Sequence, residues 1–207
     1  TLIFSLDRYQ RVMEAYLSGL EKLQSIGGDV SRVNSVASFF VSRFDTETDP
    51  RLTTIGTSEA LEMRGKTAVA NARVAYELFR RVFVGGRWDA LAADGAALQR
   101  PLWASTSTKN PDYPDTLYVD SLAASDTVNT MPRSTLEAYA DHGPVEPDLF
   151  GEAEIAQARA DLEALAAVGV DYDDVTATLE REGVEKFADS FHELIEAIDS
   201  SRLPKGA

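Results

Sequence analysis

The 207-residue sequence predicts an α/β fold in which parallel strands alternate with helices. Two patterns lead to this prediction. Short apolar runs recur along the chain as far as residue 131, and such runs are typical of strands covered on both faces. Between them lie longer segments whose apolar residues recur every three or four positions, the spacing of an amphipathic helix. Doubly wound sheets and (β/α)8 barrels both have this alternation.

The first apolar run, residues 1–5 (TLIFS), stands at the very start of the chain without an initiator Met. Chain termini are usually exposed and loosely held. A buried strand at this position therefore indicates the later part of a longer protein. A helix is expected to follow over residues 9–23, with Asp7 as its N-cap and Gly27 and Gly28 at its end.

A second apolar run, residues 36–41, predicts the next strand. Ser42 and Arg43 follow it, and a polar loop rich in Thr and Asp is expected as far as Thr57. Apolar residues at helical spacing then predict a long helix over residues 58–83 and a short one over residues 88–94.

The remaining strands and helices are predicted in the same way. Residues 100–105 indicate a third strand, and residues 126–131 a short fourth strand that Pro132 stops. Helices are expected over residues 134–142, 151–168 and 171–199, followed by a loose tail over residues 202–207.

One detail favours a barrel over a doubly wound sheet. Three predicted strands end in polar or basic groups: Ser5 after the first, Ser42 and Arg43 after the second, and Ser105 and Thr106 after the third. Barrel enzymes place their active-site groups at the carboxyl ends of several strands. Four strands would make half of such a barrel, in agreement with the abrupt start.

Composition narrows the classes of function. The chain has 20 Lys and Arg against 34 Asp and Glu, a formal net charge of −14. This charge argues against binding to nucleic acid or to an anionic membrane surface, since both need clustered cations. Cysteine is absent, which excludes disulfides, thiolate catalysis and zinc–thiolate sites and fits a reducing cytoplasm. An anionic substrate would need a local basic pocket within this acidic protein.

Two segments at the strand ends have the chemistry of an anion site. Arg43 offers a planar fork of donors suited to phosphate or carboxylate. The loop from Ser105 to Lys109 contains four hydroxyl side chains and ends in a cation, a combination that can hold a phosphate. The alternative is that these hydroxyl residues only build a turn before Asn110 and Pro111.

No catalytic residue or metal ligand is predicted within the chain. Among the lysines, only Lys109 falls at a strand end, and its loop is too open to lower the ammonium pKa toward that of a nucleophile. His142 and His192 lie on separate predicted helices, and neither has a second His nearby to form a metal site.

Four stretches of the sequence are diagnostic when taken together: TLIFSLDRYQRVMEAYLSGLE at 1–21, SVASFFVSRFDTETDPRL at 35–52, RPLWASTSTKNPDYPDTLYVDSL at 100–122 and DTVNTMP at 126–132. They resemble the transaldolase family, particularly its bacterial branch with a long carboxyl-terminal region. They keep the family's order and approximate spacing and cover most of residues 1–140. The helices after residue 150 are less diagnostic.

The resemblance implies a (β/α)8 TIM barrel of which this chain supplies strands five to eight. A single domain would span residues 1–207, with barrel elements in 1–142 and carboxyl-terminal helices and tail in 143–207. The implied activity is transfer of a dihydroxyacetone unit between sugar phosphates in the pentose phosphate pathway, without metal or organic cofactor. The family is cytoplasmic and either monomeric or homodimeric.

The resemblance also implies that the catalytic centre lies elsewhere. The family forms a Schiff base between the donor ketose and a lysine on strand four. That lysine and the acid/base carboxylates would precede Thr1, so the missing amino-terminal half of the barrel is the expected partner. By itself this chain is expected to be inactive.

What carries over is the binding half of the site. The resemblance assigns Arg43 and Ser105 to the phosphate. Some members have a second arginine where this chain has Ser107, and Lys109 would supply that missing charge. The full set of implied substrate- or phosphate-binding residues is Ser5, Phe40, Arg43, Ser105, Lys109 and Asn129.

Two alternatives stay open. Another Schiff-base barrel, a sugar-phosphate aldolase, would release its products instead of transferring them. A non-catalytic sugar-phosphate-binding module would be complete at 207 residues, but its four strands would leave sheet edges unpaired.

Overall fold

The computed structural model describes residues 1–144 and 150–201. It contains a parallel sheet of three strands in the order β1-β2-β3: Ser35–Phe40, Gln99–Ala104 and Val128–Asn129. Residues 1–5 lie on the free side of β1, where Ile3 forms an isolated parallel bridge with Phe39. Four parallel segments thus lie side by side in chain order, which confirms the predicted α/β class. The predicted tail over 202–207 is outside the described residues.

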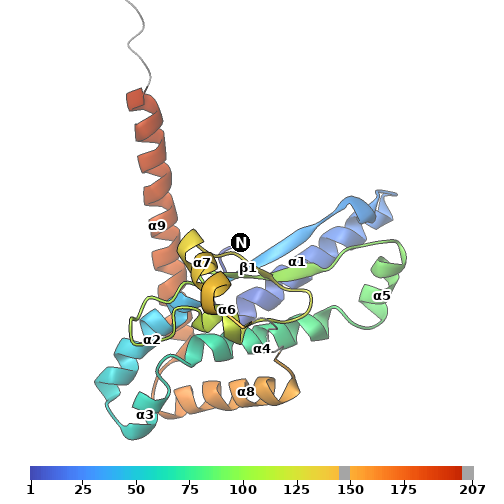
Figure 1. Cartoon of the computed structure of the whole chain (residues 1–207). Helices are drawn as coiled ribbons and strands as arrows, with labels where there is room; N and C mark the ends of the chain where they lie inside the picture. Colours follow the sequence, from blue (N-terminus) through green and yellow to red (C-terminus); the bar gives the residue numbers. More distant parts are fainter. Residues whose placement is uncertain (145–149, 202–207) are drawn as a thin grey trace, which may run out of the picture.

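Helices connect these strands and cover the sheet (Figure 1). Their bounds are α1 Leu6–Ser25, the 3-10 turn η1 Val30–Arg32, α2 Ser42–Ile55, α3 Ser58–Glu62, α4 Thr67–Val82, α5 Gly86–Ala93, α6 Leu117–Ser121, α7 Arg133–His142, α8 Glu152–Ala167 and α9 Tyr172–Ser201. No helix in the described ranges is long and apolar enough to cross a membrane.

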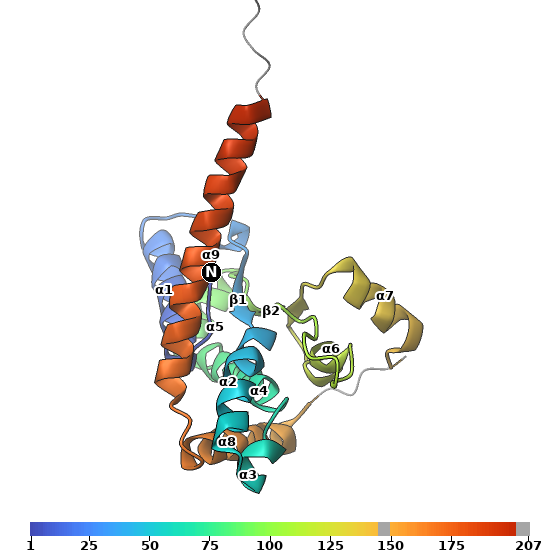
Figure 2. The same ribbon diagram turned by 90° about the vertical axis from the view of Figure 1, so that its left-hand side faces the viewer.

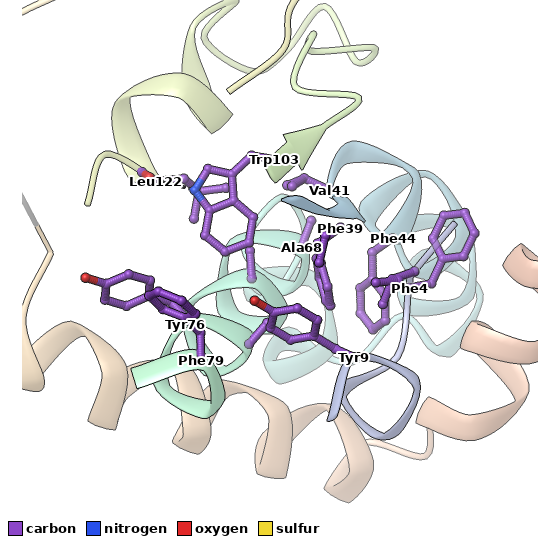
Figure 3. Close-up of a cluster of buried hydrophobic side chains, with 14 of the residues drawn as sticks. Phe4, Tyr9, Phe39, Val41, Phe44, Ala68, Tyr76, Phe79, Trp103 and Leu122 are labelled. Carbon is purple, nitrogen blue, oxygen red and sulfur yellow. Dashed lines mark hydrogen bonds between the residues drawn. The ribbon is translucent and has the colours of Figure 1, made fainter. Parts of the chain in front are cut away.

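The core lies between β1, β2 and the helices α1 and α4. Its centre is a cluster of aromatic rings, shown in Figure 3. The rings of Phe39 and Trp103 meet edge to face with centroids 6.1 Å apart, and the Tyr9 ring lies 5.7 Å from that of Phe39. The Trp103 indole N–H donates to the carbonyl of Leu122 at 3.0 Å, so burying this ring leaves no unpaired donor.

Helix α1 begins earlier than expected. Its N-cap is Ser5, whose hydroxyl accepts a hydrogen bond from the backbone N–H of Arg8 at 3.1 Å. The prediction of Asp7 as the cap was wrong, because Asp7 already lies in the first turn, where its carboxylate complements the helix dipole. Ser5 therefore joins residues 1–4, with their isolated bridge to β1, directly to the helix.

The predicted polar loop after Arg43 was also wrong, since residues 42–55 form α2. The inner face of this helix is largely polar: Asp45 and Thr48 are buried beside the apolar Phe44 and Leu52. These buried polar residues interrupt the apolar periodicity that identifies most helices from sequence.

The predicted helix over 58–83 is two helices, α3 and α4, separated by a turn. Gly65 adopts φ +72° in this turn, and a Cβ at this position would lie 2.8 Å from the Tyr113 ring. Only glycine fits both requirements. The fourth strand is shorter than predicted, only Val128–Asn129, and the short helix α6 over Leu117–Ser121 was not predicted.

A buried carboxylate links α2 to two other helices. Asp45 is 2% exposed and accepts hydrogen bonds from the Thr67 hydroxyl at 2.8 Å, the Ala68 N–H at 2.7 Å and the Tyr118 hydroxyl at 2.9 Å. Burial raises the pKa of Asp45 to about 6, although the hydrogen bonds from Thr67 and Ala68 act in the opposite direction. The folded chain therefore disfavours the ionised carboxylate.

Helix α9 is attached to the body through its first turns. The Tyr172 hydroxyl accepts from the N–H of Leu6 at 3.0 Å and donates to Oδ1 of Asn71 at 2.8 Å. The Asn71 amide donates in turn to the carbonyl of Phe4 at 2.9 Å. This network joins α9 to α4 and to the first strand, while the later turns of α9 extend beyond the body (Figure 2).

We predict that Tyr172→Phe lowers the free energy of unfolding by about 1–3 kcal/mol, because it leaves the Leu6 N–H and the Asn71 carbonyl oxygen without a partner. Urea denaturation measures this change. Tyr139→Phe is the matched control, since the Tyr139 hydroxyl on α7 takes part in no such network among the residues that the structure describes. Equal stabilities of the two variants would contradict the assigned role.

We also predict that Asp45→Asn flattens the pH dependence of stability. The folded-state pKa of about 6 lies above the ordinary value of 3.8. The contribution of Asp45 to stability is therefore full below about pH 4 and is lost as the pH rises through about 6. Asparagine keeps the acceptor oxygen and cannot ionise.

Denaturation midpoints measured between about pH 4 and pH 7 test this prediction. The variant should lose less stability over that range than the unmodified protein. Asp189→Asn, at an exposed position on α9, should retain the original profile. An unchanged profile in Asp45→Asn would show that its carboxyl titrates normally in the folded protein.

Candidate anion-binding site

A cavity of about 300 Å³ lies at the carboxyl ends of β1 and β2. Three segments of the chain form it: the first turns of α2, the loop after β2 and the middle of α9. The lining residues are Arg43, Thr46, Glu47, Ser105, Lys109, Leu179, Glu182 and Lys186. Three of the predicted site residues, Arg43, Ser105 and Lys109, are thus brought together.

The backbone places Arg43 beside the loop after β2. The β1–β2 pairing continues past the strands, because the N–H of Val41 donates to the carbonyl of Ala104 at 2.9 Å and that of Ser42 to Ser105 at 3.1 Å. Arg43 is therefore the second residue of α2. It lies at the N-terminal end of this helix, where the helix dipole favours anions.

The Arg43 guanidinium is oriented by an aromatic ring. Its Cζ lies 5.5 Å from the centroid of the Phe40 ring, a cation–π contact. The Phe40 ring packs in turn against Phe4, with centroids 5.4 Å apart. Within the described part of the chain, Arg43 forms no ion pair, so its donors remain available to a ligand.

Ser105 has an unusual backbone conformation. Its φ of 57° is in the left-handed region that non-glycine residues rarely adopt. Its hydroxyl lies 3.0 Å from that of Ser42, and either oxygen can donate. Such strained positions are often found at functional sites, and here the conformation keeps the Ser105 hydroxyl at the edge of the cavity.

The cavity is cationic despite the acidity of the chain. The Lys109 ammonium donates to the Ser107 hydroxyl at 2.5 Å, and its loop is closed by the Thr108 hydroxyl, which donates to the carbonyl of Pro114 at 2.8 Å. The Glu47 carboxylate accepts two hydrogen bonds from Arg51, at 3.0 and 2.6 Å. Arg51, which does not line the cavity, therefore compensates the negative charge of Glu47.

The other predicted residues do not line this cavity. Ser5 caps α1, and Phe40 lies beneath the Arg43 guanidinium. Asn129 accepts a hydrogen bond at 2.7 Å from the hydroxyl of the buried Thr106. Contact of Ser5, Phe40 or Asn129 with a substrate stays a prediction.

Sequence reasoning missed the contribution of α9. Leu179, Glu182 and Lys186 belong to the last predicted helix, and nothing in their spacing indicates a cavity near β1 and β2. Their position depends on where α9 docks, so no local signal could have identified them.

A second cavity, of about 460 Å³, shares Thr46 and Lys109 with the first. Its acidic residues already bond to neighbouring groups: Asp45 to Tyr118, and Asp49 to the Tyr113 hydroxyl at 2.7 Å. Among the described residues, no group of three or more His, Asp and Glu side chains could hold a metal ion. The cationic cavity is therefore the better candidate for a ligand site.

Known proteins match this chain along almost its whole length. The sequence model of the transaldolase/fructose-6-phosphate aldolase family matches residues 1–198. "Transaldolase 1" of Streptomyces avermitilis is 55% identical over 207 residues, which are 100% of this chain and 54% of that protein. The transaldolase of Acidothermus cellulolyticus is 58% identical over 201 residues, or 97% of this chain and 54% of that protein.

The chain spans about half the length of the curated relatives that it matches, and it corresponds to their carboxyl-terminal part. The family implies a TIM barrel, and the parallel strands with their helices form about half of one. Because the family model matches residues 1–198 and these relatives are more than half identical to it, the chain belongs to the transaldolase/fructose-6-phosphate aldolase family.

Proposed function

We propose that this chain is the carboxyl-terminal portion of a transaldolase and supplies the phosphate-binding half of its active site. The enzyme would transfer a dihydroxyacetone unit from sedoheptulose 7-phosphate to glyceraldehyde 3-phosphate, giving erythrose 4-phosphate and fructose 6-phosphate. A Schiff-base lysine and the acid/base carboxylates would lie in the segment before Thr1. The observation that carries the proposal is the cavity shared by Arg43, Ser105 and Lys109 in a chain of this family.

The cavity suits a phosphate group. The guanidinium of Arg43 can donate two parallel hydrogen bonds to phosphate oxygens. The Ser105 hydroxyl and the Lys109 ammonium add donors from the loop after β2. The first turn of α2 adds the favourable dipole of its N-terminal end. Holding the phosphate would fix the distance between the sugar carbonyl and the lysine, and such positioning supplies part of the catalytic rate. The reaction would use neither metal nor organic cofactor.

The partner that completes the site is, in this proposal, the preceding half of the same polypeptide. Among the described residues, the outer edges of β3 and of residues 1–4 pair with no further strand. The preceding strands would pair with both edges and close the barrel. The open edges would otherwise favour association between chains.

The exposed surface of helix α9 also favours the preceding half of the polypeptide as the partner. Its later turns carry an exposed apolar face whose side chains recur at spacings of three, four and three residues. Each is between 55% and 60% exposed: Val184 57%, Phe187 57%, Phe191 60% and Leu194 55%. Adjacent Gly183 packs on Leu2, whose side chain would lie 2.8 Å from an added Cβ. The face thus begins beside an existing contact between α9 and residues 2–4, and in this proposal the preceding half of the polypeptide would cover it.

The proposed enzyme would work in the cytoplasm on sugar phosphates, with no nucleic-acid or membrane partner, as a monomer or homodimer. Its domain would extend over residues 1–207, with the barrel elements in 1–142 and the carboxyl-terminal helices and tail in 143–207. The −14 net charge agrees with solubility and with a small anionic substrate that is bound only at a local basic site.

A second candidate activity is that of a sugar-phosphate aldolase, because the matching family model includes fructose-6-phosphate aldolase in its description. The two reactions differ in whether water or an acceptor aldose takes part. Assays of fructose 6-phosphate cleavage with and without erythrose 4-phosphate separate them: a transaldolase turns over only when the acceptor is present.

We predict that Arg43→Ala, made in the complete polypeptide, raises the KM for sugar phosphates by about 10- to 100-fold. This range corresponds to the loss of a charged hydrogen-bonded contact of about 1.5–3 kcal/mol. Steady-state kinetics with erythrose 4-phosphate as acceptor measures the effect. Thermal stability should change little, because Arg43 forms no ion pair with any of the described residues.

Arg11→Ala is the control for this variant, since Arg11 lies on the outer face of α1 in an exposed ion pair with Asp7. It should retain the original kinetics. Unchanged kinetics in Arg43→Ala would contradict the assignment of Arg43 to the substrate phosphate.

We further predict that the 207-residue chain expressed alone associates through its open edges, and that coexpression with the preceding half gives a monodisperse complex. Size-exclusion chromatography with light scattering measures both samples. A monodisperse monomer that melts cooperatively would instead favour the complete, non-catalytic sugar-phosphate-binding module.

A further inference from the structure

Helix α9 forms one wall of the cationic cavity through a single face. Leu179, Glu182 and Lys186 follow each other at intervals of three and four residues, so their side chains lie along one stripe of the helix. Leu179 is 5% exposed and anchors this stripe in the core. The two charged residues beyond it face the cavity that Arg43, Ser105 and Lys109 line from the other side.

The position of this wall is set by contacts at the start of α9. Besides the Tyr172 network, the Asp174 carboxylate accepts from Arg51 at 2.6 Å, and Arg51 belongs to α2, the helix that carries Arg43. A further ion pair joins Glu180 to Arg8 on α1. Residues from α1 and α2 thus hold α9 on both sides, and Lys186 is brought next to the cavity by the docked helix.

The Lys186 ammonium has only a weak partner within the protein. It donates to Oε2 of Glu182 at 3.2 Å, and the two side chains are 63% and 44% exposed. An exposed pair of this kind, four residues apart on a helix, contributes little to stability. A lysine on a flexible stem can therefore exchange this carboxylate for a more highly charged anion at small cost.

We propose that Lys186 is a third phosphate-positioning residue, which contacts the substrate phosphate from the side of α9, opposite Arg43 and Lys109. In the absence of an anion, Glu182 holds the ammonium at the mouth of the cavity. When a sugar phosphate enters, the ammonium turns to the phosphate, whose two negative charges offer a stronger acceptor than one carboxylate. The inference rests on the proposed function and adds a residue to the same site.

The first test is Lys186→Met in the complete polypeptide. Methionine retains the unbranched stem and removes the charge. The KM for erythrose 4-phosphate should rise about 3- to 10-fold with little change in kcat. This is the result expected when the lost contact stabilises the bound substrate and the transition state equally. The KM for unphosphorylated glyceraldehyde as acceptor should not change. Lys186→Arg should restore most of the affinity, because it restores the charge.

Arg181→Met is the matched control. Arg181 lies on the same helix but lines a different surface, with Ala177 and Val184. Its removal takes one positive charge from α9 without altering the cavity. If Lys186→Met and Arg181→Met change the KM equally, Lys186 acts only through the overall charge, and the inference is wrong.

A double variant separates direct contact from an indirect effect. Removing Lys186 alone also leaves the Glu182 carboxylate without its partner, and an unpaired carboxylate would repel phosphate. In Lys186→Met with Glu182→Gln, the higher KM should persist if Lys186 contacts phosphate. Recovery of the original KM would show that Lys186 only neutralises Glu182, and would overturn the proposal.

A binding measurement keeps this inference distinct from the proposed function. Inorganic phosphate, titrated into the complete protein by calorimetry, should bind Lys186→Met about 3- to 10-fold more weakly than the unmodified protein. If this occurs in a protein without transfer activity, the proposed function fails while the phosphate contact stands. If transfer is normal and neither phosphate binding nor KM changes in Lys186→Met, the contact fails while the proposed function stands.

Discussion

Strands β1 and β2 pair in parallel from Ser35 and Gln99 to Phe40 and Ala104, and their backbone hydrogen bonds continue to Ser42 and Ser105. This extension is the constraint on which the remaining structure depends. It starts α2 at the sheet edge, places the second residue of that helix against the loop after β2, and leaves Ser105 in a left-handed conformation. Because the hydrogen bonds follow from strand register, the relative position of the two loops does not depend on flexible side chains.

Polar groups inside the fold attach the helices to this sheet. Asp45 joins α2 to α4 and α6, and Tyr172 joins α9 to α4 through Asn71. Asp45 and Tyr172 each have a specific set of partners, and leaving any of these partners unpaired would cost free energy. These networks therefore specify where the helices dock, whereas the apolar cluster around Phe39 and Trp103 mainly supplies the stability.

The two networks also determine the composition of the cationic cavity. Arg43 follows β1, Ser105 and Lys109 follow β2, and Lys186 arrives on a helix that docks through Tyr172 and Asp174. Of the two carboxylates that line the cavity, Glu47 is paired with Arg51, and Glu182 forms only a weak, exposed pair with Lys186. A strongly acidic protein can in this way present a local positive surface to a small anion, since charges a few ångströms away outweigh those spread over the molecule.

The sequence by itself determined the parallel α/β class, because short apolar runs predict buried strands. It also predicted Arg43, Ser105 and Lys109 as candidates at strand ends, because the carboxyl ends of parallel strands meet at one edge. It did not predict α2, because burial of Asp45 and Thr48 masks the helical period. Only the tertiary structure decided that Ser5 caps α1, that Asn129 bonds to Thr106, and that Lys186 faces the cavity. These outcomes depend on contacts between segments far apart in the chain, which local residue patterns do not encode.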